Sequence, residues 1–187
     1  DIDDGSTIKE AGRQELRFAQ PLLLENIDPR TKLRFAFEMG LPNYANFLVD
    51  YEHQLSREIS VHGGIRSRYT GTNAEGGVRY ALIKSSRLQA LVTAIGDIHI
   101  NTNPFFTGIR PQIAGGKRFD LPKGFKIDVL GQLGTDLQIF NGLTPVLIGG
   151  FHVTFVPSDT VNIFMETSTY MKDFLWEEGN TFAFNTV

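Results

Sequence analysis

Residues 32–40 read KLRFAFEMG, and in this stretch apolar residues alternate with charged or small ones. Because successive side chains of a β-strand point to opposite faces, the alternation predicts a strand with one apolar face and one polar face. The apolar set is Leu33, Phe35, Phe37 and Met39, and the other set is Arg34, Ala36, Glu38 and Gly40. Which of the two faces points inward decides the fold.

The same period of two recurs along the rest of the chain. Val78, Tyr80 and Leu82 alternate with Arg79 and Ala81, and comparable runs follow one another up to residue 187, with polar stretches between them. The 19 glycines and 15 phenylalanines are likewise typical of a β-protein with many turns. We count about ten such runs and expect an all-β, antiparallel, up-and-down arrangement over residues 32–187.

Length and charge narrow the function. The chain has 187 residues, which fits one main domain, a net charge of −3 and no cysteine. The negative balance gives no field that would gather phosphates, so we expect no nucleic-acid partner. The four histidines, at positions 53, 62, 99 and 152, have no metal-ligand spacing, and we expect no metal site. The paired glycines do not lie between a strand and a helix, and we expect no bound cofactor.

Residues 1–31 lack the alternation and form a separate N-terminal region. Ile8, Ala11, Leu16 and Ala19 stand at roughly helical spacing, which predicts one short helix that ends before Pro21. Two roles stay open for this region: a segment that plugs or docks onto the domain, or a mobile leader. The expected organisation is a periplasmic leader over residues 1–31 followed by a β-domain over residues 32–187.

Alternation alone does not tell which face is inside. In a soluble barrel of the lipocalin type the apolar face encloses a ligand, whereas in a membrane barrel it faces lipid. Scarce lysine on the polar face and aromatic residues near the strand ends favour the membrane barrel. The connections favour it too, because they are expected to be short at one end (54–57, 84–87, 120–124, 156–159) and longer at the other (70–75, 101–105, 134–144, 172–180).

Two successive runs carry a resemblance to a known class of proteins. Residues 47–55 (FLVDYEHQL) are followed, after a polar turn, by residues 59–64 (ISVHGG). This sequence of strand, turn and strand resembles the small outer-membrane β-barrel proteins of Gram-negative bacteria, of the OmpA-type or porin-like kind. The resemblance implies a transmembrane β-barrel in the bacterial outer membrane, a signal peptide already removed, and contacts with lipid, lipopolysaccharide and other envelope proteins.

In such a barrel the polar set points into the lumen and brings a nearly balanced group of charges together. The predicted lumen network is Arg34, Glu38, Asp50, Glu52, Arg66, Arg68, Arg79, Asp97, Arg110, Lys126, Asp128 and Glu166. A barrel of about ten strands is narrow, because open aqueous channels belong to barrels of about 16 strands. We therefore expect a lumen filled by salt bridges, with a narrow path for small solutes, lined by Arg66, Arg68 and Arg110, as the alternative.

One pair of residues raises the possibility of catalysis. Asp97 and His99 lie on one strand face two residues apart, where a carboxylate could orient a histidine that activates water. This pair is similar to the Asp-x-His motif of omptin-type outer-membrane proteases, which implies a hydrolase as one alternative. The chain is much shorter than those proteases and has no second paired-carboxylate motif. The first interpretation is that the protein is not an enzyme and has no catalytic residues.

Apolar residues in two expected loops suggest where a partner would bind. The candidate contacts are Phe140, Leu143, Phe174 and Trp176. Exposed side chains of this kind suit contact with another protein or with lipopolysaccharide. The sequence thus favours a structural, anchoring or interaction subunit of the bacterial envelope. The alternatives are a narrow channel, an omptin-like hydrolase and a soluble lipocalin-like carrier of an apolar ligand.

Overall fold

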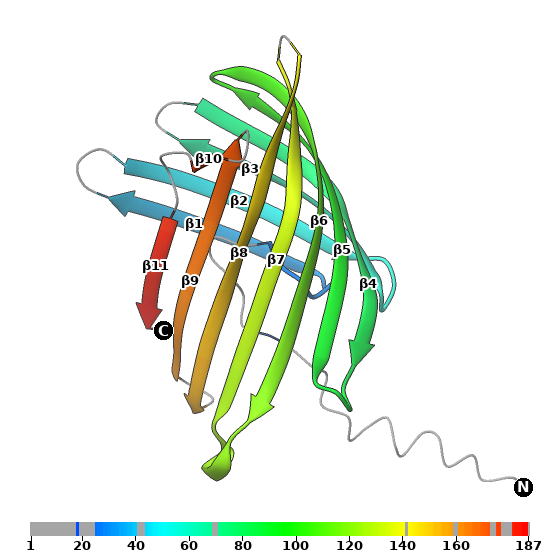
Figure 1. Ribbon diagram of the computed structural model, residues 1–187, viewed down its shortest axis with the longest axis vertical. Coiled ribbons are helices and arrows are strands. Elements are labelled where there is room, and N and C mark those ends of the chain that lie inside the picture. Colours follow the sequence, from blue (N-terminus) through cyan, green and yellow to red (C-terminus); the bar gives the residue numbers. More distant parts are fainter. Residues whose placement is uncertain are drawn as a thin grey trace, which may run out of the picture.

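The protein folds into one curled antiparallel β-sheet that has the form of a half-barrel (Figure 1). The computed structural model describes residue 18 and residues 25–40, 44–68, 71–140, 142–158, 161–172, 175–176 and 181–186. Apart from Phe18, the helix expected between residues 7 and 20 lies outside this part. None of the helices among the described residues has the length and hydropathy needed to cross a membrane. The all-β class expected from the sequence is confirmed.

The strands follow one another in space in the order of the chain. They are β1 (Lys32–Gly40), β2 (Tyr44–Gln54), β3 (Ile59–Arg68), β4 (Gly71–Ser85), β5 (Ala90–Thr102), β6 (Phe105–Asp120), β7 (Lys126–Ile139), β8 (Leu143–Ser158), β9 (Val161–Lys172), β10 (Leu175–Trp176) and β11 (Thr181–Thr186). A single turn of 3-10 helix, Pro122–Gly124, lies between β6 and β7. Each strand from β1 to β9 pairs with the next, as an up-and-down meander requires.

The two short strands at the end of the chain share one neighbour. β10 pairs with Met171 and Lys172 of β9, and β11 pairs with residues 163–168 of the same strand. Together they occupy one position beside β9. Within the described residues, β1 pairs with β2 alone, so the gap in the half-barrel lies between β1 on one side and β10 and β11 on the other.

The two faces of the sheet differ in polarity, with mainly apolar side chains on the convex face and mainly polar ones on the concave face. On the convex face, Phe35 is 66% exposed and Ile98 is 65% exposed, whereas on the concave face Glu52 is fully buried and Asp97 is 2% exposed. A water-soluble barrel would have the opposite arrangement, because apolar side chains gain free energy by leaving water. The polar set of the sequence is therefore the inner set in this structure.

The expected contrast between short and long connections is wrong. At one end of the sheet, which we call the turn end, the connections include residues 55–58, 86–89 and 121–125. At the opposite end, which we call the far end, they include residues 69–70, 103–104 and 140–142, and these are shorter still. Thr72, Asn73 and Glu75, expected in a loop, belong to β4. They are polar because their strand borders the interior, which polarity alone cannot distinguish from a solvated loop. The connection expected at 172–180 lies partly outside the described residues.

Residues 25–31 immediately precede β1 and lie against the concave face of the sheet. We call them the internal segment. Asn26, Ile27 and Asp28 are 5%, 2% and 3% exposed. Phe18 and Ile27 form a buried apolar cluster with residues of the wall, which are Ala81, Leu91, Ile95, Ala114 and Leu130. Of the two roles left open for the N-terminal region, the described residues 18 and 25–31 have the contacts of a docked segment.

Candidate functional site

The interior is organised around Arg79 of β4, whose side chain is 2% exposed. One terminal nitrogen, Nη2, lies 2.7 Å from Oε2 of Glu25 in the internal segment. The other, Nη1, lies 3.3 Å from Oε2 of Glu52 on β2 and also contacts Nδ1 of His62 on β3. A guanidinium presents several N–H donors in one plane, so Arg79 can neutralise a carboxylate of the wall and a carboxylate of the segment together.

Glu52 is the second centre of the same network. Its Oε2 lies 3.2 Å from Nζ of Lys32, which is its register partner on β1. Its Oε1 accepts a hydrogen bond from the hydroxyl of Ser60, and Nδ2 of Asn26 in the internal segment donates to its Oε2 at 3.2 Å. Glu52 is fully buried, and these partners provide the compensation that a buried charge requires.

The internal segment is bound to the wall by further polar contacts. Nζ of Lys84 lies 3.2 Å from Oδ1 of Asp28, and the hydroxyl of Thr93 donates to the backbone oxygen of Ile27 at 2.5 Å. The backbone N–H of Glu25 donates to Oε1 of Gln132 at 2.9 Å. Residues from β2, β4, β5 and β7 therefore hold one short stretch of chain, although none of them is close to it in the sequence.

A glycine makes room for the apolar side of this contact. Gly116 of β6 faces inward, and a Cβ placed there would come within 2.6 Å of Cδ1 of Ile27 and 3.3 Å of the ring of Phe18. Its neighbour Gly115 has no such contact, since the closest atom to its Cβ position is 3.7 Å away. Arg118 on the same strand lies over the ring of Phe18, 5.6 Å from its centroid.

A second polar cluster lies nearer the far end of the interior. Arg110 of β6 is 3.5 Å from Glu75 of β4 and 3.8 Å from Asp136 of β7, measured between the nearest nitrogen and oxygen atoms. His99 of β5 is 3.4 Å from Asp136 and packs edge-on against the ring of Phe106. Glu75 was not predicted because it lay in an expected loop, and Asp136, although on the polar face of its run, was not included in the predicted network because it lay at the border of an expected loop.

The pairing expected between Asp97 and His99 does not form. Asp97 lies 3.0 Å from His62 and accepts a hydrogen bond from Gln112 at 3.1 Å, whereas the nearest carboxylate to His99 is that of Asp136. Residues i and i+2 of one strand are separated by about 6.7 Å of backbone rise, so each finds a closer partner on another strand. The carboxylate beside His99 is therefore that of Asp136 on another strand, and not that of Asp97 as the Asp-x-His motif would require.

Two inward glycines allow these pairs to form across an intervening strand. Gly77 of β4 lies between His62 and Asp97 in the register, and its Cβ position would be within 2.1 Å of Oδ1 of Asp97 and 2.4 Å of the backbone oxygen of Gly96. In the same way, Gly108 of β6 leaves room for His99, whose Cε1 lies 2.4 Å from the Cβ position. A side chain at either position would occupy the space in which the pair meets.

Two other predicted charges pair with residues that the sequence reasoning had not selected. Asp128 of β7 accepts two hydrogen bonds at 2.7 Å from Arg118 of β6, its register partner. Glu166 of β9 lies 3.3 Å from Nδ1 of His152, its register partner on β8. Both pairs could have been found in the sequence only after the register of the strands was known.

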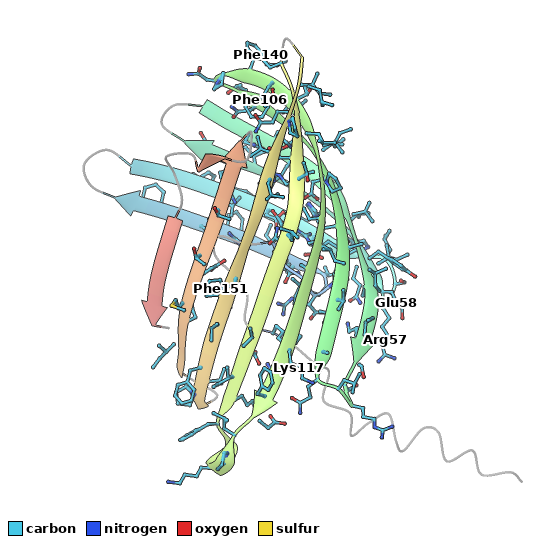
Figure 2. The ribbon with its side chains drawn as sticks, in the orientation of Figure 1. Arg57, Glu58, Phe106, Lys117, Phe140 and Phe151 are labelled. Atoms are coloured by element: carbon cyan, nitrogen blue, oxygen red, sulfur yellow. The ribbon has the colours of Figure 1, made fainter. Side chains whose placement is uncertain are left out.

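The remaining predicted residues are placed as follows. Arg34 and Asp50 are register partners on β1 and β2, Arg66 lies on β3, and Lys126 begins β7. Phe140 is 55% exposed at the far end (Figure 2), and Leu143, at the start of β8, is 65% exposed. The side chains of Glu38, Arg68 and Trp176 and the whole of Phe174 lie outside the described residues.

Electrostatics favour the charged form of Glu25 in the internal segment. Burial by itself would raise its pKa, but the charge of Arg79, supported by Arg110, His62 and Arg66, lowers the pKa from 4.5 to about 2. The segment therefore presents a full negative charge to a cluster of cations over the whole physiological pH range.

The chemistry open to the interior is ion pairing and hydrogen bonding. In the part of the chain that the structure describes, no three His, Cys, Asp or Glu residues are grouped to hold a metal ion. Comparison with models of protein families, with curated proteins and with solved structures gives no match to this chain. The function is therefore inferred from the fold and from the interior alone.

Gly77→Ala is expected to destabilise the folded protein by about 1–3 kcal/mol, because the new methyl group meets the backbone of β5 and the carboxylate of Asp97. Gly96→Ala is the matched control on the adjacent strand, since nothing lies within 4 Å of its Cβ position. Urea unfolding of the two variants in the same detergent measures the difference. Equal midpoints for both would show that the pair of His62 and Asp97 does not depend on Gly77.

The free energy that Glu25 contributes to stability is expected to depend on pH. A carboxyl whose pKa is lower in the folded state stabilises that state fully above its unfolded pKa of 4.5, and loses this contribution as the pH falls towards 2. Wild type should therefore be more stable than Glu25→Gln at pH 7, and the difference should shrink between pH 4.5 and pH 2. Unfolding midpoints across this range measure it, with Glu58→Gln at the exposed turn as control. A difference independent of pH would contradict the assignment.

Proposed function

We propose that the chain is a non-enzymatic β-barrel protein of the bacterial outer membrane, acting there as a structural, anchoring or interaction subunit of the envelope. The observation that carries the proposal is the reversal of the two faces. Apolar side chains cover the convex face, whereas the concave face is lined mainly by charged and polar ones. A sheet of this kind has its lowest free energy where lipid surrounds the convex face.

The lengths of the strands suit this location. A tilted transmembrane β-strand needs about 9–11 residues, and β3 through β9 contain 10 to 16. Phe35, Tyr51, Ile98 and Ile113 are among the convex side chains that are about half exposed or more. Transfer of such side chains into hydrocarbon supplies the driving force for insertion, at roughly 25 cal/mol per Å² of apolar surface.

Closure of the barrel is part of the proposal. Unpaired backbone groups at a strand edge are costly in hydrocarbon, where no water can satisfy them. The free edge of β1 therefore has to be paired in the membrane, and the strands on the other side of the gap, β10 and β11, are the candidates. The expected count of about ten strands belongs to this closed form.

The same geometry speaks against the other functions that the sequence left open. A lipocalin-like carrier needs an apolar interior, whereas this interior contains Glu52, Arg79, Asp97 and Asp128. An open pore is disfavoured because the internal segment and the ion pairs occupy the lumen. An omptin-like hydrolase is disfavoured because Asp97 faces His62 and not His99.

Exposed apolar residues at the far end support the proposed role in binding other components of the envelope. Phe140 in the connection between β7 and β8 projects from the sheet there (Figure 2), and Leu143 at the start of β8 is exposed as well. Side chains of this kind fit the headgroup region of lipopolysaccharide or an apolar patch on another envelope protein.

The direct test is extraction of the native protein followed by electrophoresis. We expect that the protein needs detergent to leave the envelope, and that the unboiled sample migrates faster than the boiled one because a folded barrel resists the detergent of the gel. A protein that dissolves in buffer and shows no shift on heating would contradict the proposal.

Ile98→Arg is expected to lower the stability of the protein in lipid vesicles by about 2–4 kcal/mol, because it places a charge on the convex face in the middle of β5. Leu55→Arg is the matched control, since Leu55 is 60% exposed in the turn between β2 and β3. The folded fraction against urea in vesicles measures both. A membrane location is ruled out if Ile98→Arg is as stable as Leu55→Arg.

A further inference from the structure

Phe18 and Thr31, which lie before and after Glu25 in the sequence, both contact the turn end of the sheet. Phe18 lies against Gly116, close to the turn that follows β6, and the hydroxyl of Thr31 accepts a hydrogen bond from the backbone of Gln54 at the turn end of β2. Between these two points, Glu25 reaches the middle of the sheet at Arg79 and Gln132. Because both of these contacts lie at the turn end, residues 25–31 can be withdrawn at that end without being threaded through the barrel.

Its attachment to the wall is of a kind that can be released. Within the described residues, the segment pairs with no strand, and its contacts are ion pairs, single hydrogen bonds and the side chains of Phe18 and Ile27. Most side chains of the sheet that contact the internal segment keep another partner when the segment leaves. Arg79 keeps Glu52 and His62, Glu52 keeps Lys32 and Ser60, and Gln132 keeps Gln112. Lys84 and Thr93 face the lumen, where water can replace what they lose.

We propose that residues 25–31 form a displaceable plug, held by the pairs of Glu25 with Arg79 and of Asp28 with Lys84, and that its withdrawal opens an ion-conducting path through the lumen. This proposal rests on the membrane barrel proposed above. Withdrawal vacates the turn-end half and the middle of the lumen, and the proposed path continues past the ion pairs of Arg110 with Glu75 and Asp136 at the far end. The path is narrow, because a barrel of this size lies far below the about 16 strands of open porins.

The first experiment asks whether the pairs hold the plug. The chain has no cysteine, so Ile27→Cys introduces a single reporter at a position that is 2% exposed. The full chain with this change is reconstituted into lipid vesicles and treated with a water-soluble maleimide. The test variant adds Glu25→Gln and Asp28→Asn, and the control adds Glu58→Gln and Asp120→Asn, which remove two carboxylates at exposed turns.

We expect labelling of Ile27→Cys to be about ten-fold faster in the test variant, which corresponds to about 1.4 kcal/mol less holding the plug in place, and unchanged in the control. In planar bilayers, the test variant without the cysteine should give discrete conductance events that wild type and control rarely show. A disulfide formed in an Ile27→Cys, Thr93→Cys pair within the test variant should abolish these events, and a reductant should restore them.

A second pair of variants probes the plug without changing a charge. Gly116→Val places its Cβ in the space that Ile27 and Phe18 occupy, whereas the Cβ of Gly115→Val on the same strand meets only ordinary contacts. Gly116→Val should therefore conduct and Gly115→Val should not. These variants also decide the question if the charge variants fail to fold.

The outcomes separate the two proposals. A heat-modifiable protein inserted in vesicles, in which the labelling of Ile27→Cys does not respond to the loss of Glu25 and Asp28, overturns the plug. Faster labelling without any conductance, in the charge variants or in Gly116→Val, overturns the path. A protein that stays soluble without detergent and never inserts overturns the membrane barrel itself, whatever the labelling shows.

Discussion

The sheet directs charged side chains into the interior, where each charge needs a neutralising partner. This constraint determines the arrangement of the rest of the structure. Arg79, Glu52, Asp97 and Asp128 are almost fully shielded from solvent. Leaving one of them unpaired would cost several kcal/mol, which is a large part of the stability of a domain of this size. The partners come from neighbouring strands, from strands two positions away and from the internal segment, so the interior contains several groups of paired charges, the largest of them around Arg79.

The internal segment solves a problem of space as well as of charge. In an eight-stranded barrel, side chains alone fill the interior, whereas a wider sheet leaves room that they cannot span. Ile27 and Phe18 fill this room against Leu91, Ile95 and other apolar residues near the turn end. Glu25 and Asp28 supply the negative charges that Arg79 and Lys84 require. The segment is thus held by two kinds of contact. One is a close-fitting apolar contact, and the other consists of ion pairs in which water could take the place of the segment's carboxylates.

Much of the fold could be predicted from the period of the sequence, because a strand that separates two environments repeats every two residues. The apolar inner positions Leu91 and Ile95 were missed, although Leu91-Val92 and Ala94-Ile95 are adjacent apolar pairs that mark a strand with both faces apolar. The ends of the strands were misplaced where inward polar residues such as Asn73 and Glu75 look like a loop.

The pairing inside the barrel could not be predicted, because it depends on register and on long-range contacts. His62 meets Asp97 across Gly77, and Arg79 meets Glu25 from a part of the chain with no strand pattern. Pairs close in sequence, such as Asp97 and His99, were the natural choice, yet the backbone rise keeps them apart. One signal in the sequence would have indicated contacts across an intervening strand. It is an inward glycine that lies, in the predicted register, between polar residues of the two neighbouring strands.

The sidedness of the sheet is tested most directly by cysteine scanning along β5 in lipid vesicles. Single cysteines at Thr93, Ile98, His99 and Ile100 are labelled with a small nitroxide, and collisions with a lipid-soluble and a water-soluble relaxation agent are compared. We predict that positions 98 and 100 respond to the lipid-soluble agent and positions 93 and 99 do not. Equal responses at all four positions, or a strong response of 98 and 100 to the water-soluble agent, would contradict an apolar face turned towards lipid.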